Sequence, residues 1–211
     1  MKNLFSKLLI CCAFVSFSLH AMAETPDELV RDTSRQVLDV LKRDNGKNTK
    51  AIRAEVEALV LPKFDFTRMT ALAVGRGWRD ANPEQQKQLI DQFRMLLVRT
   101  YSSTMTRFKN AQISVQASNP AADAREVTVR SDVELPAGAA GDKRSAQVDY
   151  TLIKTPTGWR VYNVSIEGAS LVTIYRNNFN DILRQGGPDA LIQSLKDKND
   201  ALSGGKQHAS N

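Results

Sequence analysis

The sequence predicts an α+β domain in which helices pack on one face of a curved four-stranded antiparallel sheet and enclose either a solid core or an apolar pocket. Three observations lead to this prediction. Apolar residues recur at helical spacing from residue 26 to residue 108, and they alternate with polar residues from 111 to 166. After Gly168 the spacing becomes helical again. Consecutive strands joined by short turns form an antiparallel sheet, whose covered face needs the flanking helices.

Residues 1–23 have the pattern of a secretory signal peptide. Lys2 and Lys7 precede the apolar run 8–19, and Ala21-Met22-Ala23 supplies the small residues of a cleavage site. The apolar run is shorter than the roughly 20 residues that span a bilayer. We therefore expect cleavage after Ala23 and export of the remaining chain.

Export of residues 24–211 would leave a chain without thiols. Cys11 and Cys12 are the two cysteines, and the large residues before them argue against a lipoprotein anchor. A chain without disulfides must be held by an apolar core, and residues 24–200 are long enough to form one domain. We expect residues 201–211 to form a disordered tail. The formal charge of +6 includes two lysines of the signal peptide, and no basic block predicts a nucleic-acid partner.

The first helices are indicated by their start and stop signals. Thr25, Pro26 and Glu28 make a capping box with proline at the first helical position, and this helix should end near Asn45-Gly46. Pro62 closes a second helix over 48–61.

The third and fourth helices lie on either side of a glycine-rich turn. Asp65 should cap a short helix that ends before Gly75 and Gly77. Asn82-Pro83 begins the longest helix, whose wide apolar stripe extends to Phe108.

Four strands follow in the second half of the chain. Alternating apolar residues predict strands over 113–115, 127–135, 148–152 and 159–166, with a hairpin loop at 136–141. In the last strand, Trp159, Val161, Asn163 and Ser165 should face one side of the sheet. Tyr162, Val164 and Ile166 should face the other side.

The last strand leads directly into a helix. Apolar residues at spacings of three and four predict a helix over 170–185, which stops at Gly186-Gly187. Pro188 begins a final helix. An interior lined by these elements is either a solid core or an apolar pocket, because the same residues line both.

Catalytic side chains are scarce in the predicted domain. The two histidines, His20 and His208, lie in the signal peptide and the tail, so triads that use histidine or cysteine and histidine metal sites are excluded. A hydrolase with two carboxylates would have to use Asp65 with Asp80 or Asp149. A helix cap is the simpler role for Asp65. We therefore expect no enzymatic activity and no metal.

Six short motifs stand out in the chain: Phe64–Met69, Gly77–Arg79, Phe93–Tyr101, Trp159–Tyr162, Ile166–Val172 and Tyr175–Phe179. Together, in this order and spacing, they resemble the MlaC, or toluene-tolerance, family of periplasmic phospholipid-binding proteins. The resemblance covers roughly residues 26–200. In one position the chain departs from it, because Asn163 stands where members usually carry Asp.

The resemblance implies a periplasmic carrier that shields phospholipid acyl chains in an apolar pocket and maintains outer-membrane lipid asymmetry. It also implies the partners between which the lipid moves. These are an outer-membrane lipoprotein–porin complex and an inner-membrane ABC transporter complex with its substrate-binding subunit. No cofactor is implied besides the phospholipid cargo, and we expect a monomer.

Candidate pocket residues lie where the helical stripes and the sheet face should meet. Four arginines are candidates for contact with a lipid phosphate at the pocket mouth, namely Arg76, Arg79, Arg99 and Arg176. The candidates for contact with the acyl tails are Phe66, Met69, Leu72, Leu97, Tyr101, Met105, Val129, Val133, Tyr150, Val164, Val172, Tyr175 and Phe179.

Two other functions agree with the same pattern. An adaptor or chaperone with a solid core would contain no lipid and would dimerise through an exposed apolar patch. A carboxylate hydrolase would lose turnover when one aspartate is changed.

Overall fold

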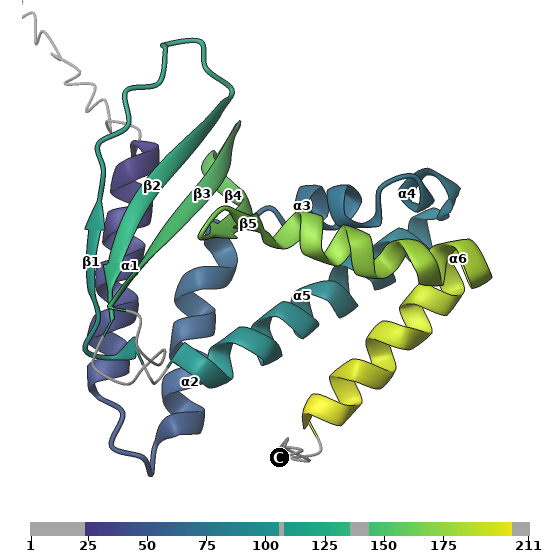
Figure 1. Ribbon diagram of the computed structural model, residues 1–211, viewed down its shortest axis with the longest axis horizontal. Helices are drawn as coiled ribbons and strands as arrows, with labels where there is room; N and C mark the ends of the chain where they lie inside the picture. Colours follow the sequence, from purple (N-terminus) through teal and green to yellow (C-terminus); the bar gives the residue numbers. More distant parts are fainter. Residues whose placement is uncertain (1–23, 106–107, 136–143, 204–211) are drawn as a thin grey trace, which may run out of the picture.

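The computed structural model describes residues 24–105, 108–135 and 144–203. The predicted signal peptide, the hairpin loop over 136–141 and the tail beyond residue 203 lie outside the described residues. The predicted α+β class is confirmed, with helices before and after an antiparallel sheet (Figure 1). Among the described residues, no helix is long and apolar enough to cross a membrane.

The helices begin where their capping residues predict. The Oγ of Thr25 accepts from the backbone N–H of Glu28, whose side chain accepts from the N–H of Thr25. Asp65 caps the third helix through a 2.8 Å bond from the N–H of Arg68. The helices are α1 (Pro26–Lys42), α2 (Thr49–Val60), the 3₁₀ turn η1 (Leu61–Lys63), α3 (Phe66–Val74), α4 (Gly77–Asp80), α5 (Pro83–Met105) and α6 (Leu171–Ser203).

The last helix, α6, contains the predicted break. Gly187 has φ 65° and ψ −162°, which lies outside the helical region and is favourable only for glycine. The segments before and after Gly187 therefore correspond to the two helices that the sequence predicts. The second segment extends to Ser203, so residues 201–203 are helical where we expected the start of the tail.

In the described residues the sheet has five strands in sequential order, and each neighbouring pair is antiparallel. The predicted four are present, and a fifth of two residues follows a turn at Glu167 and Gly168, which both have positive φ. Two residues are too few to show an alternating pattern. The strands are β1 (Gln112–Val115), β2 (Glu126–Glu134), β3 (Ser145–Thr155), β4 (Gly158–Ile166) and β5 (Ala169–Ser170).

The predicted alternation along β4 is wrong beyond its middle. Tyr150 pairs with Val164, but Leu152 pairs with Val161, so β4 has one extra residue between these pairs. Such a bulge reverses the facing of every later residue. Val161 and Val164, which we expected on opposite faces, therefore both face the interior.

The helices are unevenly distributed over the sheet. α1 packs on β1 and β2, while α3 and α6 contact β4 (Figure 1). Phe64 forms an isolated parallel bridge with Val161, and the N–H of Asp65 donates to the carbonyl of Val161 at 2.8 Å. These bonds fix the start of α3 against β4. They join the helical half, built from α3, α5 and α6, to the half around the sheet.

The buried apolar residues form three clusters. One lies between α1 and the inner sheet face, around Leu29, Val129 and Leu152. A second joins α1 to α2 through Leu41 and Val56. The largest cluster packs α3, α5 and α6 around Phe93, whose ring contacts those of Tyr175 and Phe179.

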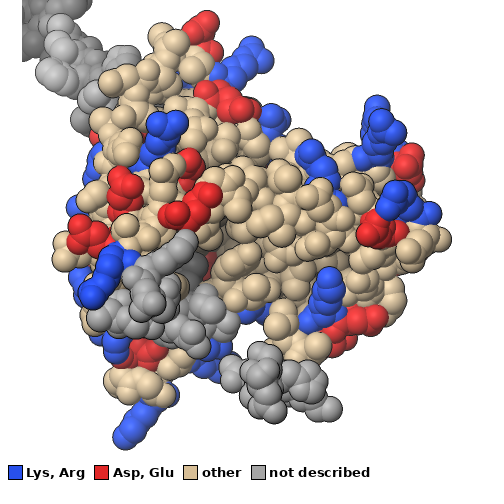
Figure 2. All heavy atoms as spheres, viewed as in Figure 1, with Lys and Arg blue, Asp and Glu red and all other residues tan. Residues whose placement is uncertain are grey.

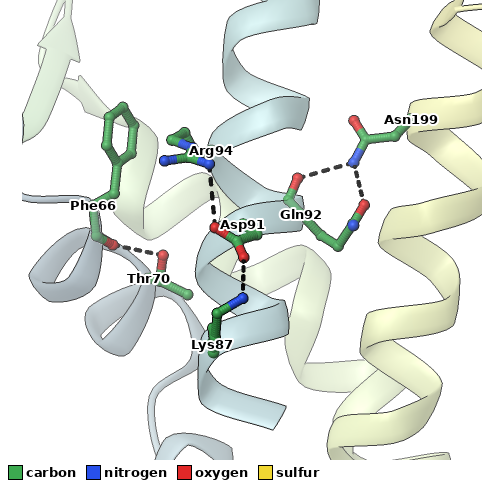
Figure 3. Close-up of polar contacts among 7 residues, drawn as sticks. All are labelled: Phe66, Thr70, Lys87, Asp91, Gln92, Arg94 and Asn199. Atoms are coloured by element: carbon green, nitrogen blue, oxygen red, sulfur yellow. Dashed lines mark hydrogen bonds and ion pairs between the residues drawn. The ribbon is translucent and has the colours of Figure 1, made fainter. Parts of the chain in front are cut away.

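A polar contact also joins α5 and α6 within the helical half. The Nδ2 of Asn199, which is 1% exposed, donates to the backbone carbonyl and to the Oε1 of Gln92, each at 2.9 Å (Figure 3). Arg99 donates to the backbone carbonyl of Asn199. These bonds align the final segment of α6 along α5.

Candidate functional site: an apolar cavity between the helices and the sheet

A cavity of about 540 Å³ lies where the three apolar clusters meet. Residues of α1, α2, α3, α5 and the inner sheet face line it. Its size is within the range of about 300–1,000 Å³ that is usual for pockets that bind small molecules. The interior is therefore hollow at this point, whereas the adaptor alternative supposes a solid core.

Seven predicted pocket residues line this cavity. They come from α3, α5 and three of the strands, which are distant in the sequence. The β4 bulge turns Val164 inward, where it is paired with Tyr150. The seven are Phe66, Met69, Leu97, Tyr101, Val133, Tyr150 and Val164.

The remaining candidates lie elsewhere. Val129 is 1% exposed and is packed beneath α1. Val172, Tyr175 and Phe179 belong to the helical cluster, because the first part of α6 turns its apolar face toward α3 and α5. Leu72 faces a different cleft on the surface, and the side chain of Met105 lies outside the described residues.

The sequence interpretation missed the contribution of α1 and α2. Their apolar stripes were recognised as buried faces, but the pattern does not reveal that they face an open space. Whether these faces meet a packed neighbour or an open space depends on how α1 packs on β1 and β2. The missed residues on these two helices include Leu29, Val30, Val37, Leu38, Leu41, Val56 and Val60.

The cavity lining is almost free of charge. Burial raises the pKa of the Tyr150 hydroxyl, and hydrogen bonding with Ser131 and Ser34 opposes this rise. The phenol therefore stays neutral at physiological pH. The charged residues of the described lining are Glu57, Lys63 and Glu167. Such a lining suits a large apolar ligand that carries few polar groups.

Lys63 and Glu167 lie at separate places on the lining. Lys63 precedes Phe64, which pairs with Val161, and it forms a 3.8 Å ion pair with Glu24. Glu167 follows the far end of β4 and accepts a 2.7 Å hydrogen bond from the N–H of Gln147. Glu167 is exposed, while Glu57 in the last turn of α2 and Lys63 are half-buried.

None of the four predicted mouth arginines lines the cavity. Arg76, Arg79 and Arg176 line a separate surface cleft beside α4 and α6. Arg99 points to the C-terminal part of α6, where it donates to the carbonyl of Asn199. Arg76, Arg79 and Arg176 thus lie together at a cleft that is separate from the apolar cavity, and their contact with a lipid phosphate stays a prediction.

The carboxylates considered for hydrolysis do not form a pair. Asp65 caps α3, as predicted, and Asp149 accepts from the side-chain amide of Gln147 at 3.1 and 3.0 Å. Asp80 lines the surface cleft beside α4 and α6. Within the described ranges, no group of three His, Cys, Asp or Glu residues could hold a metal ion.

Comparison with known proteins identifies the family. The family model described as "MlaC protein" matches residues 31–197, which extend from within α1 to within α6. The chain belongs to the MlaC family. The family assignment that the motifs suggested is thus confirmed.

Two relatives of this MlaC-family chain illustrate the similarity. Toluene tolerance protein Ttg2D of Pseudomonas putida is 25% identical over 175 residues, which cover 81% of this chain and 79% of that protein. A solved structure from Ralstonia solanacearum has 34% sequence identity and a TM-score of 0.74, and it covers 84% of this chain and 98% of that one. That structure is a phospholipid-binding protein in complex with a phospholipid.

Proposed function

We propose that this protein is a phospholipid carrier whose cavity encloses acyl tails. The single observation that carries the proposal is the nearly uncharged cavity of about 540 Å³ between α1, α2 and the sheet. The similarity to a phospholipid-binding protein that was solved with its ligand supports the assignment. In this proposal, the seven predicted residues that line the cavity contact the tails, together with the stripe of α1.

The physical need for such a carrier is large. At about 0.8 kcal/mol per methylene, exposure of about 30 methylenes of two acyl chains to water would cost roughly 20 kcal/mol. The cavity replaces one apolar environment with another, so loading and unloading are nearly balanced. Docking to a partner is then sufficient to favour either direction, and no covalent or catalytic step is needed.

We further propose that the carrier works in the periplasm. The signal-peptide pattern of residues 1–23 supports export, and the capping box of α1 begins at Thr25, directly after the expected cleavage site. The family supports the finer assignment of a shuttle between an outer-membrane lipoprotein–porin complex and an inner-membrane ABC transporter complex. Such transport would maintain the lipid asymmetry of the outer membrane.

The first experiment is mass spectrometry of protein purified from the periplasm without detergent. We expect native spectra to show a stoichiometric adduct, and denaturing spectra to show a released phospholipid and a chain that begins at Glu24. Protein that arrives empty would next be incubated with phospholipid vesicles. Failure to acquire lipid from the vesicles would contradict the carrier function.

A cavity-filling variant tests whether the lipid occupies this cavity. Val133 on β2 lines the cavity, whereas Thr128 on the same strand is exposed. We expect Val133→Trp to reduce bound phospholipid at least about tenfold, because an indole fills space needed by the tails. Thr128→Trp, as the matched control, should retain full occupancy. Equal occupancy in both variants would place the lipid elsewhere.

A further inference from the structure

A second concave site lies at the far end of the molecule, away from the sheet. It is a cleft of about 1080 Å³ between the α3–α4 turn and the first part of α6. Charged side chains gather over this end in the space-filling view, at the right of Figure 2. No residue that lines this cleft also lines the apolar cavity. The cleft and the cavity are therefore separate sites.

Arginines approach the cleft from two walls. Arg76 is the N-cap residue of α4 and Arg79 lies within this helix, three residues later. Both line one side of the cleft. Arg176 and Arg184 are on the opposite wall, two helical turns apart on α6. Asn180 lies between these two on the same wall and adds an amide donor and acceptor.

Most of this positive charge has no carboxylate partner. Arg184 is paired with Asp181, and the Nε of Arg176 donates to the backbone carbonyl of Leu72 at 2.8 Å. The latter bond holds the guanidinium of Arg176 at the cleft wall. Within the part of the chain that the structure describes, no ion pair is formed by Arg76, Arg79 or Arg176.

We propose that this cleft binds an acidic segment of a partner protein. Guanidinium groups on two facing walls can form bidentate bonds with carboxylates of an inserted segment. A planar membrane surface cannot enter a cleft between helices, so the shape favours a polypeptide over an anionic bilayer. The two aspartates of the lining, Asp80 and Asp181, would repel a segment that enters in the wrong register.

The site would let a partner hold the carrier without blocking its cargo. The cleft is lined by residues of α3, α4, their connecting turn and α6, none of which lines the apolar cavity. The proposal does not depend on lipid binding, because a chain without lipid would present the same arginines.

The test uses a fluorescently labelled deca-glutamate peptide and the purified, exported chain at low ionic strength. Binding is measured by fluorescence anisotropy for the wild type and for the charge reversals Arg76→Glu and Arg79→Glu. Both side chains are exposed, so the variants should fold, and circular dichroism checks this. We expect each reversal to weaken binding about tenfold, with unchanged phospholipid content.

Arg130→Glu is the matched control, because Arg130 is exposed on β2 and changes the net charge equally. It should weaken binding less than twofold. Equal weakening in all three variants would show attraction by net charge alone and would overturn the proposal. Phosphatidylglycerol vesicles that bind the wild type and lose binding specifically with Arg76→Glu would also overturn it, in favour of a membrane site. Absence of lipid in every variant would instead count against the carrier function.

Discussion

The half of the molecule around the sheet and the half built from α3, α5 and α6 are made from similar apolar stripes, yet one is hollow and the other is filled. In the helical half, the ring of Phe93 lies 4.8 Å from that of Tyr175 and 5.3 Å from that of Phe179, measured between centroids. Where α1, α2 and the inner strand faces meet the ends of α3 and α5, about 540 Å³ is left open. Aromatic rings packed edge to face close the first interior, whereas the aromatic and aliphatic side chains around the cavity do not meet across it.

This difference indicates that the cavity walls are positioned by contacts at the ends of α1 and α3, which we call the rim, rather than by side chains packed across the cavity. Phe64 and Asp65 connect α3 to Val161 of β4. At the first turn of α1, the carboxylate of Asp27 accepts from the hydroxyl of Ser118 at 2.7 Å, which fixes α1 to the segment between β1 and β2. Polar contacts thus fix α1 and α3 to the sheet at the ends of the cavity.

The largest expected effect compares two phenylalanines. Phe93→Ala should lower the free energy of unfolding by about 3–5 kcal/mol, because it removes a side chain from a filled interior and leaves a new void. Phe66→Ala, in the cavity wall, should cost less than about 2 kcal/mol because its surroundings already include open space. Urea denaturation measures both, and the exposed Arg94→Ala is the control. Equal costs for the two phenylalanines would remove the distinction between the halves.

A smaller effect is expected at the rim of the hollow half. Burial raises the pKa of Asp27, but hydrogen bonds from Ser118 and Arg31 outweigh this effect and leave the pKa below the ordinary value of an aspartate side chain. A depressed pKa in the folded state adds stability above the unfolded pKa, and this stability is lost as the pH falls through the folded pKa. Asp27→Asn should therefore cost about 1–2 kcal/mol at pH 7 and much less near pH 2.

The measurement for Asp27 is thermal unfolding between pH 7 and pH 2. Asp32→Asn is the control on the same helix, since Asp32 forms only an exposed ion pair with Arg35. We expect this control to follow the wild-type curve closely. A constant difference between Asp27→Asn and the wild type at every pH would show that the carboxylate charge does not support the rim.

The smallest effect concerns the connection between the halves. The Oδ1 of Asn163 accepts from the hydroxyl of Ser170 at 2.9 Å and from the N–H of Val172 at 3.3 Å, in the first turn of α6. Asn163→Asp would place a negative charge at the start of this helix and should stabilise the protein by about 0.3–1 kcal/mol.

Calorimetry of Asn163→Asp at pH 7 measures this gain, with Asn163→Ala as a control that loses the acceptor. We expect the alanine variant to be less stable than the wild type. A destabilised aspartate variant would mean that the cost of burying its charge exceeds the benefit at the helix start.

Several features of this protein are determined locally and were predicted correctly. The capping box at Thr25, the cap at Asp65 and the break at Gly187 depend on contacts or backbone angles within a few residues. The family motifs are also local strings of residues. Hence the α+β class, the family and the order of the longer helices and first four strands followed from the sequence by itself, whereas α4 and β5 did not.

The location of the open space was decided only by the tertiary structure. The β4 bulge, which turns Val164 to the same face as Val161, comes from pairing with β3 and has no periodic signal. Likewise, Phe179 and Phe66 both lie on apolar helical stripes, but one fills an interior and the other lines a cavity. Periodicity tells which face of an element is buried, whereas the distance to the opposite wall depends on how distant segments pack.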